Sequence, residues 1–260
     1  MIELHHWEPN GYFLKPLIAL HEKQVPFTSR WFDPTTFEQF APSFPRDTEA
    51  GLHLEREGPL LVHDGRYISN SFFMLEYIAA AVPGEELVPS DPQQHYRVQA
   101  WGQVMTAVGA DVSILGCAKY LAPVLKGRDA ALLQSKLQHI EPVERRAAWA
   151  AVVDGLYDER AIAAIKERLE FPLKRVESAL GESAWLAGAS YSVADIDAFA
   201  LLAGLPAMAP ELVNPQSTPH IVDFLRRMNE RKAVQAALAT SRSGKPLEAY
   251  VPGAEPSRWG

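Results

Sequence analysis

The stretch EGPLLVHDGRYISNS, residues 57–71, decides the fold of this chain. Two short β-prone runs, residues 60–62 and 66–68, are joined through an Asp-Gly pair, which is a strong local signal for a β-hairpin. Proline cannot donate to a sheet ladder, so Pro59 must stand at the head of its strand, where the X-Pro bond can be cis.

A helix is expected directly after this hairpin. Ser69 or Asn70 can cap it, and large apolar residues recur at helical spacing over residues 72–78. Strand, turn, strand and helix, with a proline in front and a polar Ser-Asn-Ser run behind, form a specific arrangement. An ordinary hairpin and helix without a ligand is the alternative that this stretch leaves open.

Upstream, the chain reads as strand, helix, strand. Residues 2–7 are β-like, residues 13–20 have helical spacing, and residues 25–32 form a second strand, so the order becomes β-α-β-β-α. Between this unit and the hairpin, Asp33 to Glu57 has several prolines and no sustained period. We expect a loop there with at most a short helix.

The remainder reads as helical. We predict a first domain at residues 1–84, an all-helical domain at residues 93–240, and an irregular, partly mobile tail at residues 241–260. Ser192 and Asp195 match a capping box that opens an apolar helix, and its role is structural. The expected helices of the second domain are residues 96–125, 128–140, 143–180 and 220–228. The fold class is α+β.

The composition argues against several classes of binding partner. The 260 residues include 47% hydrophobic and 22% charged residues, and the net charge is -7 without a basic block. This balance argues against nucleic acid or an anionic membrane surface as a partner. The only cysteine, Cys117, lies in an apolar run, so no intrachain disulfide and no cysteine-based zinc site can form. With no signal peptide or membrane segment recognised, we expect a cytoplasmic protein.

Other chemistries find little support. The adjacent His5 and His6 point to opposite faces of a strand, so they cannot readily share a metal. Asp195 and Asp197 lie two apart on a helix and do not face each other, which disfavours paired-carboxylate catalysis. Aromatic residues of the middle helices could line a site for aromatic substrates, although helical spacing makes core packing the default. These residues are Trp101, Tyr120, Trp149 and Tyr157.

The two halves in this order resemble the glutathione transferases. The resemblance implies a thioredoxin-like βαβ-ββα domain followed by an all-α domain, glutathione as co-substrate, and a dimer. In that family a cis-proline pairs with the peptide of glutathione, and a serine that opens the next helix receives its γ-glutamyl end. The corresponding glutathione-binding positions are Pro59, Leu60, Asn70 and Ser71.

A narrower resemblance joins the segments Leu14–Lys23 and Phe32–Gln39 to the bacterial lignin β-aryl etherases. It implies that glutathione thiolate attacks the carbon bearing an aryl ether, and that a phenolate departs. A polar Asn-Ser pair faces the sulfur in that branch, whereas Tyr12 and Phe13 are the aligned residues here. Phe13 has no donor, so Tyr12 is the candidate catalytic hydroxyl.

Further departures concern the glutathione site. Asn70 replaces the usual acidic residue and cannot supply a charge for the α-ammonium of glutathione. Gly58 lacks the bulkier side chain that usually precedes the proline, and the Asp33 to Glu57 loop replaces a helix that carries contacts to the glycyl end.

Two interpretations follow from the sequence. In the first, the chain is an etherase-like transferase with Tyr12 as thiolate donor and an aromatic acceptor pocket. The pocket residues would be Trp7, Phe13, Trp101 and Met105. In the second, it is a degenerate subunit that pairs with a catalytic paralogue. The partner is accordingly a second copy or a paralogous transferase.

Overall fold

A computed structural model describes residues 1–41, 43–45, 58–140 and 143–253. Its elements, in chain order, are β1 (Ile2–His6), α1 (Gly11–Lys23), β2 (Thr28–Trp31), the 3₁₀ turns η1 (Pro34–Thr36) and η2 (Glu38–Phe40), β3 (Leu60–His63), β4 (Arg66–Ile68), α2 (Ser71–Ala81), α3 (Pro92–Gly116), the π-helix η3 (Cys117–Leu121), α4 (Ala122–Lys126), α5 (Ala130–Leu137), α6 (Val143–Val153), α7 (Glu159–Glu182), α8 (Val193–Leu202), α9 (Leu205–Met208), α10 (Pro219–Asn229), α11 (Lys232–Leu238) and the 3₁₀ turn η4 (Pro246–Glu248).

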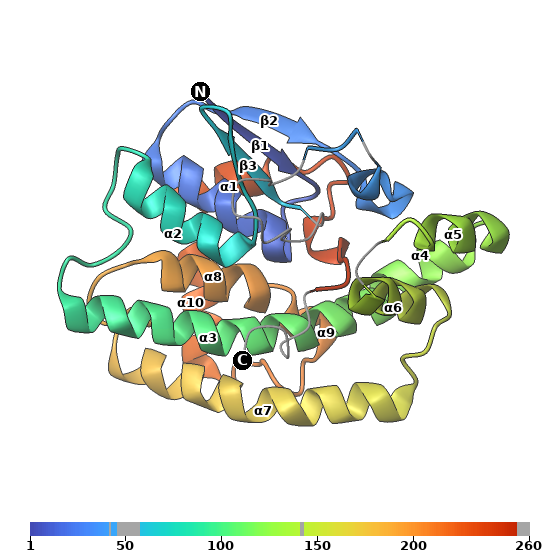
Figure 1. Cartoon of the computed structure of the whole chain (residues 1–260). Coiled ribbons are helices and arrows are strands. Elements are labelled where there is room, and N and C mark those ends of the chain that lie inside the picture. The colour runs from blue at the N-terminus through green and yellow to red at the C-terminus, as the bar shows by residue number, and fades with distance from the viewer. Residues whose placement is uncertain (42, 46–57, 141–142, 254–260) are drawn as a thin grey trace.

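The N-terminal unit is a mixed four-stranded sheet in the order β2-β1-β3-β4. β1 runs parallel to β2 and antiparallel to β3, and β3 and β4 form the predicted hairpin. The Gly58–Pro59 bond is cis, and Asn70 caps α2 as expected. Helices α1 and α2 lie between the sheet and the helical part of the chain (Figure 1).

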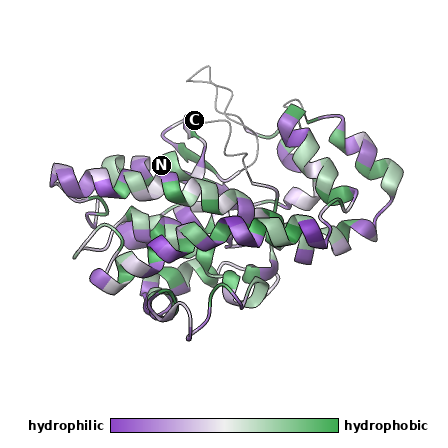
Figure 2. Ribbon diagram, turned by 90° about the horizontal axis from the view of Figure 1, so that it is seen from below, coloured by the Kyte–Doolittle hydropathy of each residue, from purple (hydrophilic) through white to green (hydrophobic). Residues whose placement is uncertain are grey.

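The helical part is built around α8, all of whose residues are buried. Ser192 and Asp195 form the predicted capping box at its start. Helix α3 packs against α7 and α8, and α1 packs on the other side of α8. Polar and apolar residues alternate along the outer helices, as helices with one buried face require (Figure 2).

Within the described part of the chain, one helical run, Pro92–Lys126, is long and apolar enough to cross a membrane by length and composition alone. Its mean hydropathy is 1.4, and 56% of the relevant window is buried inside the protein. The packing of α3 against α7 and α8 accounts for this apolar character, since a core helix passes the same test.

Several predicted boundaries were wrong. The pattern at residues 143–180 is two helices, α6 and α7, because Gly155 takes a positive φ of 66° and Asp158 caps a new helix. Strand β2 is shorter than expected, and α11 follows α10 where we predicted only one helix. In the Asp33 to Glu57 loop, η1 and η2 are short turns as expected, and residues 42 and 46–57 lie outside the described part.

Residues 241–253, which we call the C-terminal strap, belong to the tail that the sequence predicts to be irregular and partly mobile. The strap is irregular apart from η4, but it is fixed to the body of the protein at several points. Glu8 accepts hydrogen bonds from the hydroxyls of Ser241 and Ser243 at 2.5 and 2.9 Å, and Arg242 stacks on the Trp31 ring at 4.4 Å. The strap passes between the N-terminal unit and α6 (Figure 1, red).

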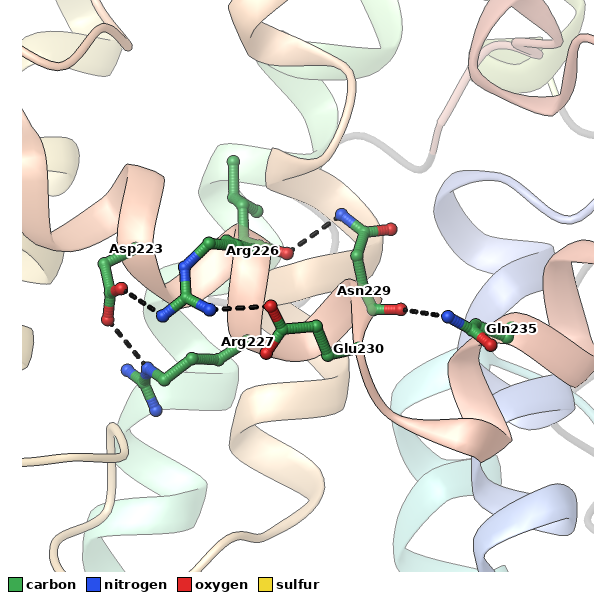
Figure 3. Close-up of polar contacts among 7 residues, drawn as sticks. Asp223, Arg226, Arg227, Asn229, Glu230 and Gln235 are labelled. Carbon is green, nitrogen blue, oxygen red and sulfur yellow. Dashed lines mark hydrogen bonds and ion pairs between the residues drawn. The ribbon is translucent and has the colours of Figure 1, made fainter.

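The turn between α10 and α11 joins the two halves. Arg231 donates to both oxygens of Glu22 on α1, at 2.6 and 3.1 Å, and stacks on the Tyr191 ring at 3.6 Å. Beside it, Arg226 bridges Asp223 and Glu230 at the surface of α10 (Figure 3). The C-terminal end of α1 is therefore bound to the helical part by a bidentate ion pair.

Candidate functional site

The site predicted from sequence lies where the N-terminus of α1 meets the cis-proline. A Cβ added at Gly58 would lie 2.6 Å from the ring of Phe32 and 3.0 Å from that of Phe13. Gly58 also has a positive φ of 63°. Both observations explain why glycine stands before Pro59 here, because the two aromatic rings occupy the space of a larger side chain.

Phe13 is thus the first-turn residue of α1 that lies next to Gly58, directly before the cis-proline. It is 2% exposed and meets Trp7 and Phe32 edge to face, with ring centroids 6.3 and 5.8 Å apart. These geometries are typical of stable aromatic packing. The side-chain surface at this position is apolar and offers no hydrogen-bond donor to a sulfur atom.

Tyr12 points elsewhere, since successive residues of a helix are about 100° apart. Its hydroxyl accepts a hydrogen bond from Ser113 Oγ at 3.3 Å, and a Cβ added at Gly253 would lie 2.2 Å from it. Burial raises the pKa of Tyr12 to about 12, although the nearby Arg145 opposes the rise. The hydroxyl therefore stays protonated and faces α3 and the C-terminal strap.

The predicted γ-glutamyl end is assembled at the opposite side of the proline. Because Leu61 pairs with Ile68, the head of β3 and the start of α2 lie at the same edge of the sheet. Asn70 takes a positive φ of 66°, and its Oδ1 accepts from the backbone of Phe72 and Phe73 at 3.0 and 3.3 Å. The side-chain oxygen of Asn70 is therefore already used to cap the helix.

Ser71 and Leu60 complete this edge. Ser71 is the first residue of α2, 9% exposed, and among the described residues its hydroxyl has no hydrogen-bond partner. Leu60 begins β3, pairs with His5 and is 4% exposed. Pro59, Leu60, Asn70 and Ser71, the predicted glutathione-binding residues, thus lie at the same edge of the sheet.

The residues predicted to form an acceptor pocket belong to two parts of the chain, the start of the N-terminal unit and α3. Trp7 and Phe13 contact each other beside the sheet, but Trp101 donates its indole N–H to the carbonyl of Leu186 at 2.8 Å. Met105 is fully buried in the core. Trp149 likewise packs against Phe37 and Phe40. Core packing, the default for these helical aromatic residues, explains their positions.

Three charged residues of the interior have contacts that the sequence analysis did not predict. Lys15 and Asp197 form an ion pair of 2.6 Å with side chains 4% and 1% exposed. Arg145 is fully buried and donates to the carbonyls of Pro252 and Gly253 at 2.9 and 2.6 Å. The signal for the first pair was present, because a lysine and an aspartate within apolar helical runs need a partner when buried.

Burial also shifts the pKa values of two further groups, Asp195 and Cys117. Burial raises the pKa of Asp195 to about 7, although the backbone amides of Leu186 and Ser192 donate to the carboxylate at 2.9 Å. Burial also raises the pKa of the Cys117 thiol, so it is a poor nucleophile. Within the described ranges, no group of three or more His, Cys, Asp or Glu residues could hold a metal ion.

Comparison with known proteins agrees with this architecture. Residues 149–241 match the model of the glutathione S-transferase C-terminal domain. The N-terminal unit lies outside this match, and it contains the sheet, the cis-proline and the capped α2. The C-terminal part of the chain thus matches a glutathione S-transferase domain, and the whole chain resembles these transferases.

Among the proteins that it resembles, Protein LigF of Sphingobium sp. (strain NBRC 103272 / SYK-6) is 26% identical over 248 residues, covering 93% of this chain and 94% of LigF. The crystal structure of β-etherase LigF superposes with a TM-score of 0.83 at 25% identity, over 92% of this chain and 99% of that one. The tetrachloro-p-hydroquinone reductive dehalogenase of Sphingobium chlorophenolicum is 24% identical over 91% of this chain and 95% of its own length.

This transferase homologue therefore has an N-terminal thioredoxin-like unit and a helical C-terminal unit, and it is related to a β-etherase. At the predicted site it has the apolar Phe13 beside Gly58, and the strap covers Tyr12.

Proposed function

We propose that this transferase homologue takes part in glutathione-dependent cleavage of β-aryl ethers as a subunit that does not activate the thiol itself. The observation that carries the proposal is the position of Phe13, whose ring lies against Gly58 beside the cis-proline. The relation to the β-etherase LigF supports the reaction class.

The need to stabilise the glutathione thiolate explains why Phe13 decides between the two candidates. A free thiol has a pKa near ~8.5, so only a small fraction is thiolate at neutral pH, and a transferase must stabilise the anion. A hydroxyl or amide donor at the start of α1 would do so. Phe13 has none, and the hydroxyl of Tyr12 faces Ser113 and the strap.

In the proposed complex, a paralogous transferase with a polar pair at these two positions activates glutathione. The glutathione thiolate attacks the carbon that bears the aryl ether, and a carbon–sulfur bond forms. The carbon–oxygen bond breaks, and its electron pair leaves with the aryl oxygen as a phenolate. This chain contributes to the stability of the dimer. We also propose that it works in the cytoplasm, where glutathione keeps thiols reduced, and that residues 1–84 and 93–240 are its two domains.

A second candidate is independent catalysis with glutathione bound by this chain. The unused hydroxyl of Ser71 at the edge that also carries Asn70 favours it, because that edge retains a donor for the γ-glutamyl group. In this case Tyr12 would have to move away from Gly253 to reach the sulfur atom.

Titration with glutathione, followed both by calorimetry and by the ultraviolet absorbance of the thiolate, separates the two candidates. The purified chain would be titrated alone, and then after mixing with a paralogue that has the Asn-Ser pair. We expect a stable complex on mixing, and no thiolate absorbance from this chain alone. Thiolate formation by the isolated chain that disappears in Tyr12→Phe would contradict the proposal and establish the second candidate.

A further inference from the structure

The last part of the C-terminal strap is inserted into the helical half of the protein. Tyr250 is 5% exposed. A Cβ added at Gly116 would lie 2.1 Å from its ring, and a Cβ added at Gly204 would lie 2.0 Å from its hydroxyl oxygen. The phenol thus fills a space that exists because two residues lack side chains. We call this space, formed by Gly116, Tyr120 and Gly204, the phenol socket.

The wall of the phenol socket has an unusual backbone. Tyr120 stacks on Tyr250 with ring centroids 6.0 Å apart and an angle of 10° between the rings. Tyr120 belongs to the π-helix Cys117–Leu121, which interrupts the α-helical run after Gly116. Single π-turns inside α-helices occur frequently at functional sites. Here the π-turn provides the stacking ring next to the glycine.

Polar donors from separate elements converge beside the socket. Asn10, immediately before α1, donates to the carbonyl of Ala249 at 2.9 Å, while Asn10 Oδ1 and the Tyr250 hydroxyl are both buried without a hydrogen-bond partner among the described residues. Arg145 of α6 donates to the carbonyls of Pro252 and Gly253. An apolar cavity with a few convergent polar groups is the usual construction of a small-molecule site.

Residues 249–253 are held by burial of Tyr250 and Val251 and by hydrogen bonds from other elements. Residues 249–253 form neither helix nor strand, and their carbonyls are bound by the side chains of Asn10 and Arg145. Both donors would serve any acceptor oxygen equally well. Release of residues 249–253 therefore breaks the hydrogen bonds from Asn10 and Arg145, exposes Tyr250 and Val251, and empties the socket.

We propose that the phenol socket is a binding site for a phenol, which the chain fills with its own Tyr250, and that a phenolic ligand displaces residues 249–253 from it. Burial raises the pKa of Tyr250, which indicates that the site takes the phenol in its neutral form. Because aryl ether cleavage releases a phenol, the inference deepens the proposed function, on which its biological meaning rests.

The test uses p-cresol, which reproduces the tyrosine side chain, and toluene, which lacks the hydroxyl. Both are titrated calorimetrically into the full wild-type chain and into Tyr250→Ala. We expect p-cresol to bind the variant at least about tenfold more tightly than the wild type, because the empty socket needs no displacement. Toluene should bind the variant at least about tenfold more weakly than p-cresol.

Hydrogen exchange then reports the displacement in the unaltered protein. Saturating p-cresol should speed amide exchange at residues 249–253 of the wild type, and toluene should not. Tyr96→Ala is the matched control, because Tyr96 is 69% exposed on α3 and should leave p-cresol binding unchanged.

Unchanged exchange in the wild type, at a p-cresol concentration that saturates the variant, would show a permanent plug and overturn the inference. Equal binding of toluene and p-cresol to the variant would also overturn it. If Tyr250→Ala does not fold, the exchange measurement on the wild type decides. No readout involves glutathione or turnover, so failure of the socket and failure of the proposed function are distinguishable.

Discussion

The Lys15 ammonium lies 2.6 Å from the Asp197 carboxylate, in the interior between α1 and α8. Lys15 Nζ also lies 5.0 Å from the centre of the Tyr12 ring. The helix whose N-terminus meets the cis-proline is thereby joined to the central helix of the other half. A buried pair of this kind matters most when one partner is removed, because the other charge is left desolvated.

Asp197→Ala should accordingly lower the free energy of unfolding by roughly 3–5 kcal/mol. The double variant Lys15→Met/Asp197→Leu should lose much less, because no charge remains buried. Urea denaturation of each variant measures the effect. The matched control is Asp223→Ala, which breaks exposed pairs with Arg226 and Arg227 (Figure 3) and should cost less than about 1 kcal/mol. Equal losses for the two aspartates would contradict the structure.

Gly58→Ala should destabilise the protein by roughly 2–4 kcal/mol, since the added Cβ meets the Phe32 ring at 2.6 Å and the backbone has a positive φ. Gly65→Ala separates the two causes. Gly65 also has a positive φ, 83°, but open space around its Cβ, so only the backbone cost of roughly 1–2 kcal/mol applies. Thermal unfolding would compare them, and an equal loss of stability would exclude the clash.

Ser71→Ala should weaken glutathione binding, if this chain binds glutathione, by roughly 0.5–1.5 kcal/mol, the usual contribution of a neutral hydrogen bond. The melting temperature should hardly change, because the Ser71 hydroxyl has no partner among the described residues. Asn70→Ala, in contrast, should lower the free energy of unfolding by about 1 kcal/mol, since it removes the cap of α2. A larger melting shift for Ser71→Ala than for Asn70→Ala would refute these assignments.

Acid should loosen the C-terminal strap through Glu8. Burial alone would raise the pKa of Glu8, but hydrogen bonds from Ser241, Ser243 and the Arg242 amide outweigh it and lower the pKa below the usual 4.5. A lowered pKa in the folded state means that the stabilisation is complete above about pH 4.5 and is lost as the pH falls through the folded-state value.

Amide exchange of residues 241–243, followed from pH 7 to pH 3, measures this loss of protection after correction for intrinsic rates. Glu8→Gln should be less protected than the wild type at pH 7 and should lack the additional acid-dependent step. A wild-type profile without such a step would show that Glu8 does not hold the strap.

Local chemistry within residues 57–71 was enough to predict the centre of the fold. An Asp-Gly turn, a proline that must begin its strand and an asparagine cap are decided by neighbours in sequence, and the structure has the cis bond, the hairpin and the capped α2. The capping box at Ser192 was predictable for the same reason. Periodicity located the helices, but it ran through the break at Gly155, where backbone conformation rather than hydrophobicity ends α6.

Only the tertiary structure decided which side chains face the cis-proline. Tyr12 and Phe13 are neighbours in sequence, so no local pattern shows which ring meets Gly58 and which hydroxyl meets Gly253. The strap was expected to be mobile because its composition is irregular, whereas its fixation depends on Glu8, Asn10 and Arg145, which lie more than a hundred residues away. Sequence determined the elements, because these depend on short-range chemistry. The fold determined the contents of the site, because those depend on contacts between distant segments.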